Sequence, residues 1–193
     1  MLHLVTSENR DIYGGELREM HAHRKRVFID QLGWPLEPDG DLEFDAFDTD
    51  TAIYLLSLAP DGQLRASARM LRTDEAHLLD TVFPHLCDAP PPRGDSIWEA
   101  TRFCRAPGTP NGAARHAMLG RIIAGIMEAG LLFGIEQVTF VASAALAPLA
   151  LRAGWAARAL GPAQRVGRER LAAFIADIDS AGLRQVKARH GLA

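Results

Sequence analysis

The sequence predicts an α/β fold in which helices sandwich a mixed, twisted sheet. Two segments of alternating apolar and polar residues flank the turn signal Pro60-Asp61-Gly62, an arrangement that indicates an antiparallel hairpin. A strand, a long helix and another strand follow between residues 97 and 142, and this order implies a parallel pair with a right-handed crossover. Because both kinds of pairing are expected, the sheet should be mixed.

Length and composition suit one globular domain that spans residues 1–193. Hydrophobic residues make up 48% of the chain, which is enough to build a core of this size. The formal net charge is −3 and no nucleic-acid-reading motif is present, so we expect no nucleic-acid partner. The two cysteines, Cys87 and Cys104, lack the spacing of a metal site, which favours a reduced, cytoplasmic protein without a bound metal.

No segment is expected to enter a membrane. Residues 1–6 lack the basic and long apolar regions of a signal peptide. Residues 117–135 form the most apolar stretch, but Arg121 and Glu128 interrupt it. A buried helix of a soluble protein is therefore the better interpretation of this stretch.

Residues 2–6 are predicted to form a strand, and residues 10–32 a helix. The helix carries an apolar stripe at spacings of three, four and seven residues. Arg24 falls on this stripe, where a guanidinium needs a partner unless it reaches solvent at the rim. Gly33 and Pro35 end the helix. The stripe consists of Tyr13, Leu17, Met20, Val27 and Phe28.

An acidic loop follows over residues 37–50, with seven acids and no Lys or Arg. The residue order of a calcium-binding loop is absent, so we expect no metal here. Phe44 and Phe47 are expected to anchor the loop to the domain and to hold Asp45 and Asp48 in place. The alternative is that these two carboxylates only cap turns of the loop.

The hairpin consists of predicted strands at 53–59 and 63–72. Alternation places Arg69 on the same face as Arg65, Ser67 and Leu71, and this face is expected to border a cleft. Residues 75–87 are predicted to form a short helix and loop.

The next predicted strand, residues 97–104, carries Glu99 and Arg102 among apolar neighbours. Alternate residues of a strand point to opposite faces, so one of the two charged groups would be buried without a partner. Either the strand lines a polar cleft or a bulge turns both groups to one side. Both interpretations indicate a functional site.

The rest of the chain alternates between helices and strands. We predict a loop at 105–112, a long helix at 113–133, a strand at 137–142 and a helix at 144–153. Strands at 156–160 and 170–177 and a helix at 180–190 complete the chain. Residues 152–170 contain five arginines against one acid, which is either a solvated face or a surface for an acidic partner.

Three groups of residues resemble those of the acyl-homoserine-lactone synthases, the LuxI-type autoinducer synthases. Their spacing matches the family over residues 20–104, and Ala153-Gly154-Trp155 and Leu160-Gly161-Pro162 are also similar. Two positions depart from the family: Arg72 stands where many members have Pro, and Thr101 stands where many have Ser. The groups are Arg24…Phe28…Trp34…Asp45-x-x-Asp48, Ala68-Arg69-Met70-Leu71-x-Thr73 and Glu99-x-x-Arg102-Phe103.

The resemblance implies a sheet splayed into a V, similar to the GCN5-related N-acetyltransferase fold, with a bulge in the strand at 97–104. It also implies the reaction. An acyl group passes from a thioester to the amine of S-adenosylmethionine, which is a substrate rather than a cofactor. Lactonisation then releases methylthioadenosine and yields an acyl-homoserine lactone, a quorum-sensing signal.

The resemblance assigns catalytic roles to acids and arginines. Glu99 is expected to act as the base, in a network that joins Arg24 to Asp48 and Glu99 and joins Arg69 to Asp45. A structural ion pair is the alternative for Glu99 and Arg102. The expected catalytic residues are Glu99, Arg24, Asp45, Asp48, Arg69 and Arg102; those for S-adenosylmethionine are Arg24, Phe28, Trp34, Arg102 and Phe103. The alternative for Phe28, Trp34 and Phe103 is that they only pack in the hydrophobic core.

The resemblance also implies a tunnel for the acyl chain. Phe140 stands near a position where members that select 3-oxo chains often carry Thr, so we expect no preference for 3-oxo groups. The expected pocket residues are Phe140, Ala142, Leu146 and Leu149. The donor is expected to be an acyl carrier protein or acyl-CoA that contacts Arg152, Arg158, Arg165 and Arg168.

Two other functions remain possible on the sequence. A different acyltransferase of the same fold would need a glycine-rich phosphate turn after residue 104, and the turn there is weak. A nucleic-acid-binding module would use the arginines at 152–170, which the overall charge argues against.

Overall fold

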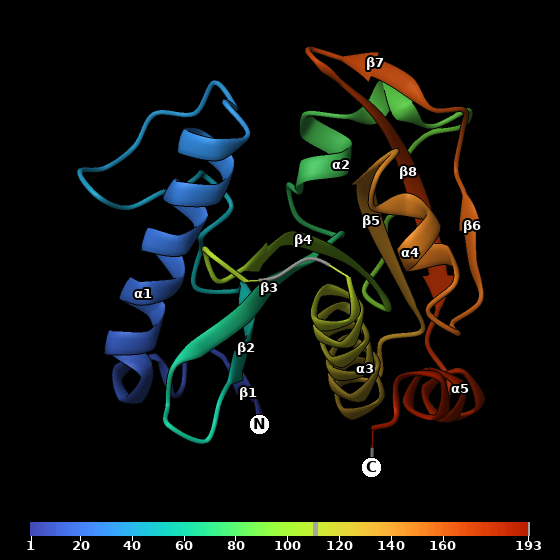
Figure 1. The fold of residues 1–193 in the computed structure, drawn as a ribbon. Coiled ribbons are helices and arrows are strands. Elements are labelled where there is room, and N and C mark those ends of the chain that lie inside the picture. Colours follow the sequence, from blue (N-terminus) through green and yellow to red (C-terminus); the bar gives the residue numbers. More distant parts are fainter. Residues whose placement is uncertain (110–111, 193) are drawn as a thin grey trace.

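The computed structural model describes residues 1–109 and 112–192. Pro110 and Asn111, in the predicted loop 105–112, lie outside the described residues. One mixed sheet runs through the molecule in the order β1-β2-β3-β4-β5-β8-β6, with β7 paired to β8 (Figure 1). The strands are β1 (Leu2–Val5), β2 (Ile53–Leu58), β3 (Leu64–Arg72), β4 (Ile97–Arg105), β5 (Gln137–Ser143), β6 (Ala157–Ala159), β7 (Gln164–Val166) and β8 (Glu169–Asp177).

The predicted fold class is confirmed. Strands β2 and β3 form the expected antiparallel hairpin, and β4 and β5 pair in parallel across the long helix α3 (Ala113–Phe133). The parallel pairing runs from Ile97 opposite Gln137 to Ala100 opposite Phe140 and then stops, although both strands continue. The sheet therefore splits between β4 and β5, as a V-shaped sheet requires.

Helices cover the two faces of the sheet. Figure 1 shows α1 (Gly14–Arg24) on one side of β1–β4, and α3 with α5 (Ser180–His190) on the other. α3 packs closely against β1 and β2, because a Cβ at Gly125 would overlap the side chain of Leu2. Among the described helices, α3 alone is long and apolar enough to cross a membrane, and 56% of that stretch is buried inside the protein. The shorter helices are α2 (Leu78–Thr81) and α4 (Ala147–Leu151).

The helix predicted at 10–32 is not one regular helix. It begins as a 3₁₀ turn, η1 (Arg10–Tyr13), continues as α1 and ends as a π-helix, η2 (Lys25–Gln31). A further 3₁₀ turn, η3 (Pro84–Leu86), follows α2. Periodicity alone does not distinguish these helix types, since one apolar stripe fits all three over a few turns.

Two other predicted elements differ from the structure. The helix predicted at 144–153 covers only Ala147–Leu151, because Pro148 has no N–H to donate and is favoured at a helix start. The predictions omitted β7, a three-residue strand that forms a hairpin with β8 through Gly167, whose φ is 59°. The strand is only three residues long and has the charged Arg165 at its centre, so it shows no hydrophobic pattern that would predict a strand.

Candidate active site

A β-bulge in β4 organises the candidate site. Thr101 lies opposite Arg69 of β3, and Cys104 lies opposite Ser67, so Arg102 and Phe103 together face the single residue Ala68. Arg102 adopts φ 51°, a conformation that residues with a side chain rarely adopt. The bulge predicted for this strand is confirmed.

The bulge changes which side chains share a face. Arg102 is turned to the face of Arg69 and Glu99, where it meets acids of the loop 37–50. Phe103 moves to the opposite face and packs against the core beneath α3. The bulge thereby places Glu99 and Arg102 on one side of β4, which is the second of the two interpretations of this strand.

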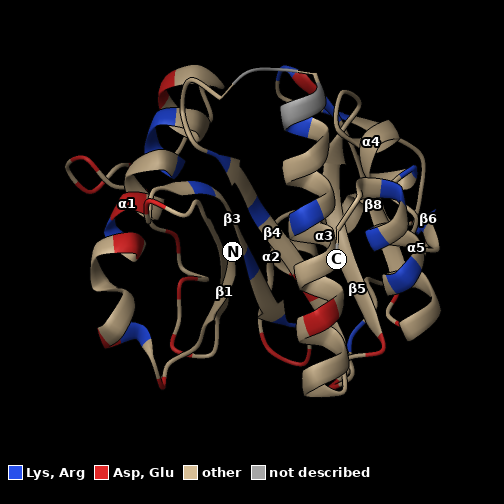
Figure 2. Ribbon diagram, turned by 60° about the horizontal axis from the view of Figure 1, so that its bottom comes forward, with Lys and Arg blue, Asp and Glu red and all other residues tan. Residues whose placement is uncertain are grey.

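Three arginines and three acids meet on this face, and we call them the charged cluster. They come from α1, the loop 37–50, β3 and β4; Figure 2 shows the arginines along β3 and β4 between α1 and α3. Equal numbers of positive and negative groups make the cluster neutral, as burial requires. The members are Arg24, Arg69, Arg102, Glu43, Asp45 and Asp48.

Arg24 is fully buried and holds two acids. Both of its terminal nitrogens donate to the carboxylate of Asp48 at 2.8 Å, and its Nε donates to Glu43 at 2.5 Å. The predicted pair with Asp48 is confirmed, whereas the predicted link from Arg24 to Glu99 is wrong. The carboxylate of Glu99 is instead held by backbone N–H groups of α2, and Glu43 takes its place beside Arg24.

Arg69 and Arg102 connect the same acids from β3 and β4. Arg69 donates to both oxygens of Asp45, at 2.5 and 3.0 Å, which confirms the predicted pair, and it also lies 2.8 Å from Asp48. Arg102 contacts Glu43 at 2.9 Å and Asp45 at 2.7 Å. Each acid of the charged cluster therefore bridges two arginines.

Glu43 is the functional candidate that the sequence reasoning missed. Its side chain is completely buried, and both of its oxygens bind arginines. A signal was available, because three arginines on one face need three acids and only two had been assigned besides Glu99. Seven acids in the loop made the choice ambiguous.

The arginines keep Asp45 and Asp48 of the charged cluster ionised. Burial alone would raise the pKa of Asp48, but hydrogen bonds from Arg24 and the charge of Arg69 hold this pKa well below its usual range. The hydroxyl of Tyr54 also donates to Asp48 at 2.9 Å.

His21 lies beside the charged cluster, and its ring stacks on Phe44 with the ring centroids 3.8 Å apart. Burial is the main cause that lowers the pKa of His21, and the positive charge of Arg24 lowers it further.

An aromatic pair lies against the cluster. Phe28 and Trp34 stack with their ring centroids 4.7 Å apart. The backbone N–H of Trp34 donates to the backbone carbonyl of Phe28 at 2.9 Å. The guanidinium of Arg102 lies 5.4 Å from the Phe28 centroid and 5.7 Å from the Trp34 centroid. The pair thus offers aromatic faces to a cation at the edge of the charged cluster.

Glu99 is fully buried beside the cluster but outside it. Its two oxygens accept hydrogen bonds from the backbone N–H groups of Leu78, at 2.8 Å, and Leu79, at 3.0 Å. Burial raises the pKa of Glu99 to about 7, even though these two hydrogen bonds and nearby arginines favour the charged form. A carboxyl with this pKa can both take up and release a proton near neutral pH.

An apolar cavity of about 80 Å³ opens where β4 and β5 separate. Phe140 and Leu146, which were expected to line a tunnel for the acyl chain, both line this cavity. Ala142 and Leu149 do not; Ala142 is buried in the core and Leu149 packs against it. Phe103, expected to bind S-adenosylmethionine, lines this cavity instead of joining the aromatic pair. The other lining residues are Ala68, Ala100, Thr101, Arg102, Leu119, Ile122, Ile123, Ile126, Val141, Ala150 and Trp155.

The four arginines expected to meet the donor are all exposed on the β6–β8 side of the molecule. Arg165 lies directly opposite Arg170 in the β7–β8 hairpin, and Arg168 is in the turn between these strands. Like charges in cross-strand positions destabilise a hairpin, so this surface suits a negatively charged partner.

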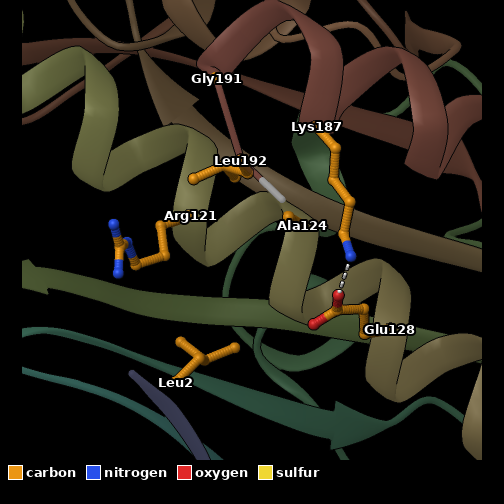
Figure 3. A pocket seen from close by; sticks show the side chains of 7 residues that line it. All are labelled: Leu2, Arg121, Ala124, Glu128, Lys187, Gly191 and Leu192. Atoms are coloured by element: carbon orange, nitrogen blue, oxygen red, sulfur yellow. Dashed lines mark ion pairs between the residues drawn. The ribbon is translucent and has the colours of Figure 1, made fainter.

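A second cavity lies apart from these residues. It measures about 250 Å³ and opens at the surface between β1, α3 and α5, where Lys187 and Glu128 form an ion pair at 2.8 Å (Figure 3). No member of the charged cluster lines it. Within residues 1–109 and 112–192, no group of three His, Cys, Asp or Glu side chains is placed to hold a metal ion.

Comparison with known proteins gives one consistent family. The family model described as autoinducer synthase matches residues 8–186. An acyl-homoserine-lactone synthase of Pseudomonas aeruginosa is 30% identical over 178 residues, which cover 90% of this chain and 85% of that protein. A synthase of the same name from Rhizobium etli is 31% identical over 157 residues, covering 80% of this chain and 74% of that protein.

Solved structures agree with the sequence comparison. The chain is similar to MesI, a CoA-dependent acyl-homoserine lactone synthase, with a TM-score of 0.87 and 31% identity over the whole chain and 96% of MesI. It is similar to BjaI, solved with SAM and isopentyl-CoA, with a TM-score of 0.89 and 26% identity over the whole chain and 90% of BjaI. An acyl-CoA N-acyltransferase from Pseudomonas aeruginosa, 18% identical with a TM-score of 0.62 over 91% of this chain and 97% of that one, shares the fold. This chain belongs to the autoinducer synthase family.

Proposed function

We propose that this protein is an acyl-homoserine-lactone synthase that acylates S-adenosylmethionine from an acyl thioester. One observation carries the proposal: residues 101–103 of β4 separate a charged cluster with an aromatic pair from an apolar cavity. The charged side suits the substrate that carries an amino-acid group and a sulfonium, and the apolar side suits the acyl chain of the other substrate. The relatives named above support the same assignment.

The charged side is proposed to hold S-adenosylmethionine. The faces of Phe28 and Trp34 already lie against the guanidinium of Arg102, so they suit the positively charged sulfonium or the adenine ring. Arg24, Arg69 or Arg102 holds the substrate carboxylate, while the acids of the charged cluster keep these guanidiniums in position.

Glu99 is proposed to start the reaction by taking a proton from the substrate ammonium, directly or through a water. The neutral amine nitrogen then attacks the thioester carbonyl carbon, the C–N bond forms and the C–S bond breaks. The thiolate leaves and takes up the second amine proton. β4 has no pairing with β5 beyond Ala100, so backbone N–H groups of the bulged segment are available to the oxyanion.

Lactonisation needs orientation rather than a strong base. The substrate carboxylate oxygen attacks the γ-carbon, the C–O bond forms, and the bond from that carbon to the sulfonium breaks. Methylthioadenosine leaves as a neutral molecule, so no proton has to be supplied. An arginine that holds the carboxylate in a folded-back position lowers the barrier by pre-ordering the two reacting atoms.

The acyl carrier is proposed to meet the exposed arginines Arg152, Arg158, Arg165 and Arg168. The like-charge pair of Arg165 with Arg170 supports an anionic partner there. Acyl carrier protein and the phosphates of CoA both have this charge. The carrier is identified by comparing kcat/KM for acyl-CoA and acyl carrier protein donors that bear the same acyl group. The variant Arg165→Ser is expected to raise KM for the true donor without changing kcat.

The function is tested by incubating the protein with S-adenosylmethionine and a panel of acyl-CoA and acyl carrier protein thioesters. We expect methylthioadenosine and an acyl-homoserine lactone in equal amounts, measured by mass spectrometry. The value of kcat/KM should rise with pH through two limbs, one near 7 from Glu99 and one near 8 from the substrate amine.

The variant Glu99→Gln separates the two limbs. It is expected to lower kcat by about 10²- to 10⁴-fold and to lose the limb near pH 7, while the limb of the amine remains. Glu75 is an exposed carboxylate in the loop between β3 and α2, and Glu75→Gln is the matched control that should keep full activity. A well-folded protein that releases no methylthioadenosine with any donor would exclude the synthase.

A further inference from the structure

Two stacked aromatic rings form one wall of the apolar cavity. The indole of Trp155, which follows α4, stacks on Phe140 of β5 with their centroids 5.2 Å apart and their planes at 18°. Phe174 of β8 stacks on the same Phe140 at 5.2 Å and supports it from the neighbouring strand. Both Phe140 and Trp155 line the cavity, whereas Phe174 does not.

The position of Trp155 is fixed by its surroundings. The indole is buried, and its Nε1–H donates to the carbonyl of Ala150 in α4 at 2.8 Å. The preceding residue, Gly154, has φ 113° and lies so close to the backbone of α5 that a Cβ would come within 3.1 Å of it. Moving the ring aside would leave a buried N–H without a partner, so the wall is rigid.

The volume of this cavity can be compared with the volume of an acyl chain. A cavity of about 150 Å³ that binds benzene provides roughly 25 Å³ for each carbon atom. On that scale the 80 Å³ here accommodates roughly three to four carbon atoms. Ile122, Ile123 and Ile126 of α3 form an apolar side wall, and the polar residues Thr101 and Arg102 of β4 line the cavity on another side.

We propose that this protein transfers short acyl groups of about four or five carbons, and that Trp155, backed by Phe140, sets the limit. The proposal rests on the synthase activity proposed above and adds the class of acyl substrate. Trp155 is thus a specificity-determining residue for the length of the chain. Longer chains would have to displace a stacked indole together with its buried hydrogen bond.

The wild-type test is a series of saturated acyl-CoA thioesters from two to twelve carbons, with a branched five-carbon member, at saturating S-adenosylmethionine. A matched acyl carrier protein series runs in parallel. Each methylene that the cavity accepts should raise kcat/KM about fourfold. We expect a maximum at four or five carbons and a fall of at least tenfold by eight carbons, measured as methylthioadenosine release.

Variants test the wall itself. Trp155→Leu should move the maximum to longer chains by two or more carbons. Ala150→Val, which places two extra methyl groups in the cavity and leaves the Ala150 carbonyl intact, should move it to shorter chains. Met127→Ala is the control, because Met127 is buried in the same core but does not line the cavity; it should destabilise the protein and leave the preferred length unchanged.

The outcomes separate the two proposals. A wild-type maximum at eight carbons or more, or an unchanged maximum in both Trp155→Leu and Ala150→Val, overturns the size limit while the synthase stands. No product with any thioester removes the synthase, and the size limit falls with it. If Trp155→Leu does not fold, the shift in Ala150→Val decides the question.

Discussion

At the scale of single residues, Glu43 is the most deeply buried acid of the charged cluster. It is completely buried and is the acid that Arg24 and Arg102 share, although the two arginines come from elements far apart in the sequence. Each arginine has one other acid, Asp48 for Arg24 and Asp45 for Arg102. Loss of the charge on Glu43 would therefore leave a buried excess of one positive charge.

Glu43→Gln is expected to lower the free energy of unfolding by about 3 kcal/mol, because breaking a buried ion pair leaves an uncompensated charge in the interior. The measurement is urea unfolding at pH 7. Glu75→Gln is the control: it removes the same charge from a half-exposed pair with Arg72 and should change stability by less than about 0.5 kcal/mol. A loss below about 1 kcal/mol for Glu43→Gln would show that water replaces the carboxylate.

At the scale of elements, the end of the first helical segment positions the aromatic pair. The segment widens from α1 into the π-helix η2, in which Leu32 donates to Val27, five residues earlier. Gly33 then reverses the chain with φ 65°, and Trp34 folds back to donate to Phe28. π-Helical turns are rare and often accompany functional sites, which agrees with the position of this one.

Gly33→Ala is expected to lower the free energy of unfolding by about 1 kcal/mol, because a side chain disfavours this left-handed conformation. The added Cβ would meet no atom within 4 Å, so the effect isolates backbone strain. Gly15→Ala in α1 adds a Cβ to equally open space without a positive φ, and it should raise stability by about 0.5 kcal/mol. Equal effects of the two substitutions in thermal unfolding would contradict this account.

At the scale of the whole molecule, the sequence predicted the fold class, the element order and the pairs of Arg69 with Asp45 and of Arg24 with Asp48. Alternation and turn residues are local signals, and they suffice for these elements. The bulge became predictable because Glu99 and Arg102 could not both be satisfied in a regular strand.

The sequence did not identify Glu43 as the second partner of Arg24, and Glu99 was expected in its place. Both are acids at plausible positions, and the choice depends on α2, whose backbone N–H groups hold Glu99. The face on which Phe103 lies could not be predicted, for a related reason. A bulge shifts the alternation of every residue after it, so the face of Phe103 follows from the position of the bulge within the strand.

The pH dependence of stability combines opposite contributions from this site. Asp45 and Asp48 have lowered pKa values in the folded state, so their contribution is present above about pH 4 and is lost as the pH falls. His21 and His23 also have lowered pKa values, so stability is lost as the pH falls below about 6.5. Glu99 has a raised pKa of about 7, and it acts in the other direction.

Protonated Glu99 favours the folded state, so its contribution is complete below about pH 4.5, the ordinary pKa of a glutamate, and is lost as the pH rises through about 7. Gln at position 99 does not titrate, and the difference between the wild type and Glu99→Gln therefore cancels the other groups. We expect the stability of the wild type relative to Glu99→Gln to fall by up to about 3 kcal/mol between pH 4.5 and 8, measured by urea unfolding. A constant difference across this range would mean that Glu99 stays ionised in the folded protein, and it would also remove the basis for its role as a base that works near neutral pH.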